Sequence, residues 1–101
     1  MRVLVLFDLP MESSQEKREY AHFRKFLIKN GFLMLQKSVY SKLALNGTAA
    51  NVIMDSVRRN KPAYGLVQML AITEKQFSRM EFVLGQSHSE VLDSTERLVV
   101  F

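Results

Sequence analysis

The chain contains no cysteine, and this absence removes several classes of function at once. Without thiols there is no disulfide framework, no cysteine-based zinc site and no cysteine nucleophile. Glycine and proline are scarce, with four and two residues, which is not the composition of a fibrous or low-complexity chain. No apolar run approaches the roughly 18 residues of a membrane-spanning helix, and Asp8 and Pro10 interrupt the first apolar segment too early for a signal peptide. We therefore expect an intracellular, cytoplasmic protein that does not act at a membrane.

The chain has 101 residues, of which 48% are hydrophobic and 24% charged, as is typical of one globular domain spanning residues 1–101. Its net charge of +4 is unevenly distributed. Residues 17–61 hold ten basic and two acidic side chains, whereas residues 1–16 and 62–101 each carry a net charge of −2. Such a positive region attracts polyanions, and nucleic acid is the commonest polyanion in a cell. A solvated basic surface without a partner is the alternative interpretation.

The hydrophobic periodicity predicts an alternation of strands and helices. The predicted strands cover residues 2–7, 32–45, 64–72, 82–84 and 97–101. The predicted helices cover residues 13–30, 46–61 and 73–80. Residues 36–38 are expected to form a bulge or bend, so the second strand is either one long strand or two short ones. This order predicts an α+β fold, a ferredoxin-like (βαββαβ) two-layer sandwich with an added C-terminal strand.

The first predicted helix is amphipathic and basic. Ser13 and Glu16 form a capping box at its start, and Gly31 is a natural stop. Its predicted buried stripe consists of Tyr20, Phe23, Phe26 and Leu27. The candidate nucleic-acid-binding residues are Lys17, Arg18, Arg24, Lys25 and Lys29, together with Lys37 of the following strand region. These cations would contact phosphates rather than base edges, which predicts affinity without sequence preference.

The C-terminal segment, residues 82–101, predicts contact with a second chain. Residues 98–101 are all apolar, and an apolar edge strand either pairs within its own sheet or adds to the sheet of another chain. We therefore predict a homodimer in which these terminal strands help to join the two subunits.

Asp8 is the strongest candidate for chemistry, because it follows an apolar strand at the end where ligands gather in open sheets. Its carboxylate is a suitable ligand for Mg²⁺ or Mn²⁺, and two such carboxylates brought together across a dimer axis would make a workable site. The alternative is that Asp8 only caps the turn before Pro10. The chain has neither a G-x-G-x-x-G nor a Walker motif, and no basic residue is placed by spacing to activate a serine.

The chain resembles the Cas2 family, the small CRISPR-associated proteins of the spacer-acquisition machinery, over nearly its whole length. The segments that carry the resemblance are Phe7-Asp8-Leu9-Pro10, residues 23–27, Gly31-Phe32, Gln36, residues 38–43, residues 73–77 and residues 96–101. Their order and spacing together are more specific than any one of them.

The resemblance implies a ferredoxin-like homodimer that binds double-stranded DNA, the prespacer, and bridges the subunits of the spacer integrase. It also implies a metal-dependent endonuclease activity on RNA or DNA, with Asp8 as the catalytic residue and Mg²⁺ ligand. Two positions depart from the family pattern: Phe7 stands where many relatives have tyrosine, and Met34 where some have arginine. With one carboxylate per subunit, we expect weak cleavage and a primarily structural role. The alternative is a small dimeric interaction or regulatory module without nucleic-acid chemistry.

Overall fold

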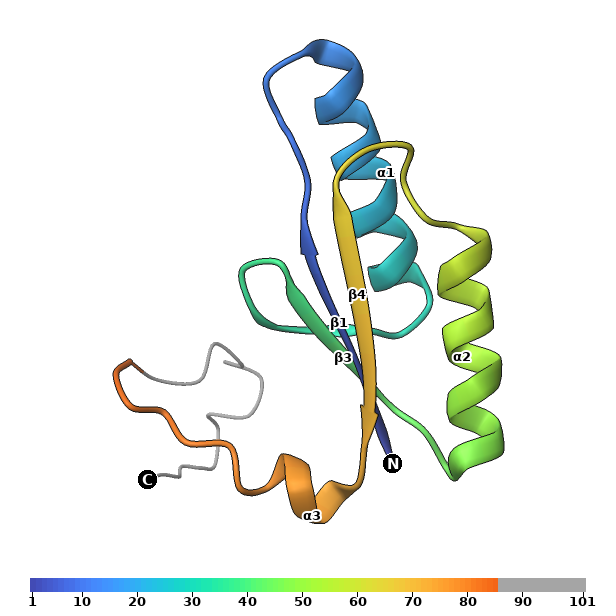
Figure 1. The fold of residues 1–101 in the computed structure, drawn as a ribbon, viewed down its shortest axis with the longest axis vertical. Coiled ribbons are helices and arrows are strands. Elements are labelled where there is room, and N and C mark those ends of the chain that lie inside the picture. The colour runs from blue at the N-terminus through green and yellow to red at the C-terminus, as the bar shows by residue number, and fades with distance from the viewer. Residues whose placement is uncertain (86–101) are drawn as a thin grey trace.

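A four-stranded antiparallel sheet lies at the centre of the structure, a computed structural model that describes residues 1–85. The elements are β1 (Arg2–Asp8), α1 (Ser14–Lys29), β2 (Leu33–Gln36), β3 (Val39–Leu43), α2 (Gly47–Arg59), β4 (Leu66–Ile72) and α3 (Glu74–Phe77). The strand order is β2-β3-β1-β4, and α1 and α2 lie on the same side of the sheet (Figure 1). The ferredoxin-like two-layer fold is therefore confirmed.

Local hydrogen bonds determine where α1 begins and ends. The backbone amide of Glu16 donates to the Ser13 hydroxyl at 3.0 Å, and the Ser13 amide donates to the Glu16 carboxylate at 3.0 Å. The donors from Ser13 and Glu12 hold the pKa of the Glu16 carboxyl below its usual range. At the other end Gly31 adopts φ +88°, a left-handed conformation that glycine accepts without strain. The predicted capping box and glycine stop are confirmed.

The predicted strand region 32–45 forms two short strands, which decides between the two alternatives. Lys37 and Ser38 form a turn between β2 and β3, and Ser38 has φ +65°. The register of the pair also shifts between Met34 and Gln36, which marks a bulge next to the turn. The chain therefore reverses at residues 37–38.

Two of the predicted strands differ from the structure. The predicted strand 82–84 is not formed: residues 83–85 form a bend, and Val83 and Leu84 are 91% and 93% exposed. Within residues 1–85 this segment pairs with no strand of the sheet, and a strand needs a partner for its backbone hydrogen bonds. β4 begins at Leu66, two residues later than predicted, because Gly65 bends the chain with φ +94°. The predicted loop 86–95 and strand 97–101 lie outside the described residues.

The core lies between the sheet and the two long helices. Alternate residues of β1 point to opposite faces, so Val3, Val5 and Phe7 are all buried beneath the helices. Phe23 and Leu27 of α1 are fully buried against them, and the rings of Phe7 and Phe23 meet edge-on with centroids 5.2 Å apart. The predicted stripe of α1 is thus the core-facing side, with Tyr20 and Phe26 half-buried at its margins.

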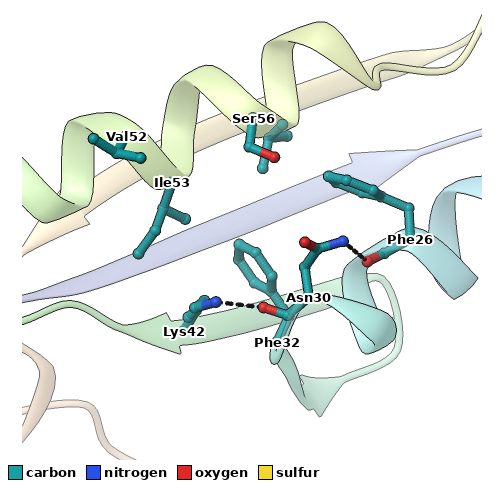
Figure 2. A pocket seen from close by; sticks show the side chains of 8 residues that line it. Phe26, Asn30, Phe32, Lys42, Val52, Ile53 and Ser56 are labelled. Atoms are coloured by element: carbon teal, nitrogen blue, oxygen red, sulfur yellow. Dashed lines mark hydrogen bonds between the residues drawn. The ribbon is translucent and has the colours of Figure 1, made fainter.

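A pocket of about 210 Å³ remains between α1 and α2 above β3 (Figure 2). Phe26 of α1 and Val52 and Ser56 of α2 line it, so these three side chains mark the sides on which the two helices face each other. At its floor the Lys42 ammonium donates a hydrogen bond to the carbonyl of Asn30, at the C-terminal end of α1. A cation in this place complements the negative end of the helix dipole.

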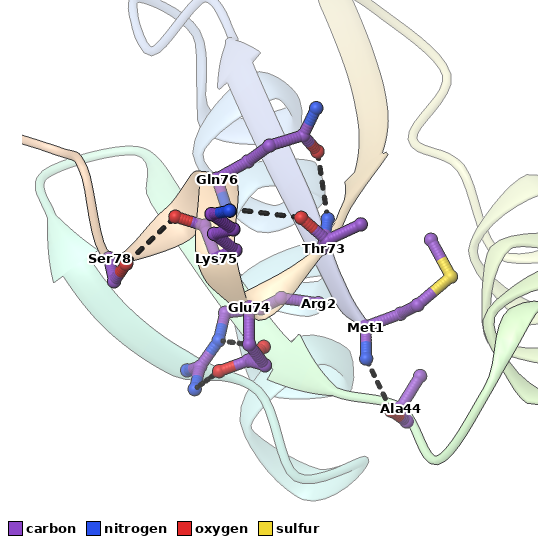
Figure 3. Close-up of polar contacts among 8 residues, drawn as sticks. All are labelled: Met1, Arg2, Ala44, Thr73, Glu74, Lys75, Gln76 and Ser78. Atoms are coloured by element: carbon purple, nitrogen blue, oxygen red, sulfur yellow. Dashed lines mark hydrogen bonds and ion pairs between the residues drawn. The ribbon is translucent and has the colours of Figure 1, made fainter.

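The first residues of the chain hold α3 against the sheet (Figure 3). The Arg2 guanidinium donates two hydrogen bonds to the Glu74 carboxylate, at 2.9 and 3.1 Å, and lies 4.1 Å from the centroid of the Phe77 ring. The hydrogen bonds from Arg2 lower the pKa of the Glu74 carboxyl. The N-terminal ammonium donates to the Ala44 carbonyl at 3.0 Å, which joins the start of β1 to the end of β3.

The described part of the chain contains no helix that is both long enough and apolar enough to cross a membrane.

Candidate functional site

Asp8 is the last residue of β1, a strand paired on both sides, and its side chain is exposed at the C-terminal end of this strand. It pairs with Leu66 of β4, and the alternation along β1 places it on the face opposite to α1 and α2. The preceding amide, that of Phe7, donates to the Ser38 carbonyl at 3.0 Å, so the end of β1 is also joined to the β2–β3 turn. The strand therefore holds Asp8 at a defined place on the open face of the sheet.

Gly65 packs directly against the backbone of Asp8, a contact that the sequence did not indicate. A Cβ atom at residue 65 would lie 2.7 Å from the Asp8 carbonyl oxygen and 2.6 Å from Leu9 Cδ2. Any other side chain would meet these atoms and would also be strained at φ +94°. The only sequence signal was a glycine at the second position of the predicted strand 64–72, which does not say what it would contact.

The face of the sheet that carries Asp8 is rich in leucine, although Arg2, Ser41 and Gln68 share it. Five of its leucines are 37–67% exposed, and their positions within paired strands make them part of one surface. We call this surface the open face; its exposed apolar residues are Leu6, Leu33, Leu43, Leu66 and Leu70. An exposed cluster of apolar side chains of this kind marks an interaction site in soluble proteins.

Asp8 does not belong to a cluster of metal ligands within the part of the chain that the structure describes. Among residues 1–85, no group of three or more histidine or acidic side chains is close enough to hold a metal ion. A single exposed carboxylate is a weak ligand set for Mg²⁺ or Mn²⁺, which bind several oxygen atoms. Residues 1–85 of one copy therefore supply too few ligands for the metal, and a metal site built on Asp8 would need ligands from a second chain.

The six candidate nucleic-acid-binding side chains are all exposed. They are Lys17, Arg18, Arg24, Lys25 and Lys29 of α1 and Lys37 of the β2–β3 turn. The two salt bridges in the described residues join Arg2 to Glu74 and Arg58 to Asp55, so none of the six is neutralised by a neighbour there. The structure leaves them free to meet an anionic partner.

The two acidic side chains of α1 offset only part of this charge, since the helix carries five lysine and arginine residues, and both acids accept hydrogen bonds from backbone amides rather than pairing with those cations. Glu16 closes the capping box, and the Glu19 carboxylate accepts a hydrogen bond from the Ala63 amide at 2.9 Å. Glu19 thus ties α1 to the connection between α2 and β4. Its partner lies 44 residues away in the sequence, so spacing alone could not have shown this contact.

The position of Met34 separates it from Asp8. Met34 pairs with Tyr40, which is buried on the side of the sheet that faces the helices, whereas Asp8 lies on the open face. Met34, which stands where some family members have arginine, therefore points to the side of the sheet opposite to Asp8.

Comparison with known proteins gives consistent results. A family model described as CRISPR associated protein Cas2 matches residues 1–80. A Treponema denticola protein named CRISPR-associated endoribonuclease Cas2 is 53% identical over 100 residues, which cover 99% of each chain. A protein of the same name from Ligilactobacillus salivarius is 43% identical, again with 99% of each chain covered.

A solved structure supports the same fold. The crystal structure of Streptococcus pyogenes Cas2 at pH 6.5 matches with a TM-score of 0.60 at 20% sequence identity, and the match covers 84% of this chain and all of that chain. The family model spans most of the sequence, and both curated relatives are well above 30% identical over nearly the full length. On these grounds the chain belongs to the Cas2 family of CRISPR-associated proteins.

Proposed function

We propose that this protein is a dimeric, DNA-binding subunit of the spacer-acquisition machinery, which holds double-stranded prespacer DNA and bridges the subunits of the spacer integrase. The observation that carries the proposal is the surface of α1, where five exposed lysine and arginine residues outnumber the two acids of the helix and form no salt bridge within residues 1–85. Such an excess of cations along one helix binds a phosphate backbone without reading its sequence. Membership of the Cas2 family agrees with this role.

The open face supports the dimer. If two copies pack through this face, the leucines leave water and the helices, with their cations, remain on the outside. Asp8 lies on the same face, so this arrangement would also bring the Asp8 carboxylates of the two subunits toward each other. Such a dimer presents basic surfaces on both outer sides, as a bridge between integrase subunits requires.

Size-exclusion chromatography with light scattering tests this proposal directly. The purified protein should have about twice the 11.7 kDa mass of one chain, and it should co-elute with a short DNA duplex at low salt. Adding the integrase subunit should produce a larger species that contains both proteins. A stable monomer would overturn the dimer and the bridging role together, and absence of duplex binding at low salt would favour an interaction module without nucleic-acid chemistry.

A second candidate function is weak endonuclease activity on RNA or DNA that depends on Mg²⁺ or Mn²⁺. The names of the two curated relatives describe them as endoribonucleases, and the exposure of Asp8 at the end of β1 is the feature here that favours such an activity. Two Asp8 carboxylates, one from each subunit, would hold the cation. When bound, the cation would supply positive charge to a phosphate and acidify a water molecule.

Replacing Asp8 with asparagine tests the nuclease. Asp8→Asn keeps the size of the side chain and removes its charge, so we expect metal-stimulated cleavage of labelled RNA and duplex DNA to fall to background. Because Asp8 is exposed and at a strand end, the melting temperature and the mass in solution should stay close to those of the native protein. Cleavage that persists in the purified variant would show that Asp8 does not carry the activity.

A further inference from the structure

The basic residues of α1 lie in two rows on different sides of the helix. Phe26 of α1 faces α2 across the pocket (Figure 2). His22 lies four residues before Phe26, and Lys29 lies three residues after it. Residues three or four apart share one side of a helix, so both lie beside Phe26 on the side toward α2. Adding the residues that continue this spacing defines the α2-side row: Arg18, His22, Lys25 and Lys29. Lys17 and Arg24, seven residues apart, lie around the other side.

α2 presents a matching row to α1. Val52 and Ser56 line the pocket, and Arg59 follows at the spacing that keeps it on the same side of the helix. Arg59 is exposed, and it forms no salt bridge within residues 1–85. Its neighbour Arg58 points elsewhere, because its guanidinium is paired with Asp55, three residues back on α2. Two adjacent arginines at one helix end are thus placed in different surroundings.

The end of α2 lies beside the α2-side row. α1 and α2 run in opposite directions, and the last turn of α2 lies beside the second half of α1 (Figure 1), where Ser56 lines the pocket together with Phe26. The Ala63 amide, four residues after Arg59, donates a hydrogen bond to the Glu19 carboxylate and so ties the segment that follows α2 to α1. Arg59 and the four members of the α2-side row outnumber this one acid, so the surface that they share carries a net positive charge.

We propose that Arg59 is a phosphate-contacting residue of this protein and completes, with the α2-side row of α1, a two-helix surface for the backbone of a nucleic-acid duplex. This inference rests on the proposed function and assigns a part of its DNA-binding surface. From Arg18 to Lys29 the row extends about 16 Å, along which one strand of a duplex carries roughly five phosphates. Packed helices lie about 8–10 Å apart, so Arg59 stands across the groove between the helices from the row.

The two arginines at the end of α2 provide the test, because each serves as the control for the other. In fluorescence anisotropy with a short labelled DNA duplex, Arg59→Ala should weaken binding about 5- to 10-fold near 0.1 M salt. It should also reduce the slope of log K against log salt by about one unit, as loss of one phosphate contact does. Arg58→Ala removes the same charge from the adjacent position and should change the affinity by less than about twofold. An RNA duplex of the same sequence should show the same ranking, because phosphates are common to both.

The outcomes separate this inference from the function on which it rests. Equal losses for the two variants, or a larger loss for Arg58→Ala, would overturn the role of Arg59 while leaving duplex binding established. If the native protein and both variants fail to bind either duplex at low salt, the proposed DNA-binding function itself is wrong. Both arginines are exposed at a helix end, so circular dichroism should show that both variants keep the native fold.

Discussion

Reversing the charge of three residues of α1 should abolish tight duplex binding. In the variant Arg18→Glu/Arg24→Glu/Lys25→Glu, three cations become anions on the exposed surface of one helix. Each lost phosphate contact is worth roughly eightfold in affinity near 0.1 M salt, so we expect the affinity for a DNA duplex to fall by at least about 100-fold. The salt dependence should flatten by about three units of slope, which distinguishes lost phosphate contacts from general weakening. Anisotropy titrations at several salt concentrations measure both quantities.

A control variant with the same change in net charge makes this result specific to α1. Arg58→Glu/Lys75→Glu/Arg79→Glu places the three reversals on α2 and near α3, and all three residues are exposed. If binding responded only to total charge, both triple variants would lose affinity equally. A duplex affinity that survives the α1 reversals would show that the basic helix is a solvated surface and not the binding site.

The second large effect should come from placing acids on the open face. Leu66 and Leu70 of β4 are 55% and 51% exposed within one chain, so Leu66→Asp/Leu70→Asp should fold normally as a monomer. In a dimer packed through this face the four introduced carboxylates would be buried without partners, at a cost of several kcal/mol for each ion. We expect dimerisation to weaken by at least about 10³-fold, so that light scattering reports the mass of one chain.

Leu45 provides the matched control for this prediction. It is 90% exposed and lies in the connection between β3 and α2, away from the sheet. Leu45→Asp makes the same chemical change and should remain dimeric. A Leu66→Asp/Leu70→Asp protein that still elutes as a dimer would show that the subunits join through another surface.

The two variants also test how dimerisation and DNA binding are linked. A dimer packed through the open face would turn both α1 helices outward, so each dimer would offer DNA two basic surfaces, one on each outer side. The monomeric open-face variant should then bind duplex DNA more weakly than the native protein, although its α1 is unchanged. The α1 variant should remain a dimer, since its substitutions lie on the opposite side of the sheet from the open face.

The helix ends were predictable because they depend on neighbours in the sequence. The Ser13–Glu16 capping box and the Gly31 stop are formed by groups within a few residues of each other, and the structure contains both where the sequence predicts them. The same holds for Thr73 and Gln76 at the start of α3. By contrast, residues 82–84 have the composition of a strand but do not form one, because a strand also needs a partner that composition does not supply.

The candidate site also combines a feature that the sequence predicts with features that only tertiary contacts determine. Asp8 could be singled out from the sequence as a lone acid at the end of an apolar strand, and the structure places it at that strand end. Its contact with Gly65 and its place on the leucine-rich open face depend on the pairing of β1 with β4, whose residues are about 60 positions away. No local pattern encodes which residues that pairing brings together.

The sequence by itself determined the order of the elements, the limits of the long helices and the concentration of positive charge in the first half of the chain, because these follow from short-range hydrogen bonds, periodicity and composition. Only the tertiary structure decided which cations of α1 lie on the side toward α2, that Arg59 rather than Arg58 stands beside them, and that leucines of four strands form one face. These features arise when segments distant in the sequence pack together, and the direction of each side chain then depends on its neighbours in space.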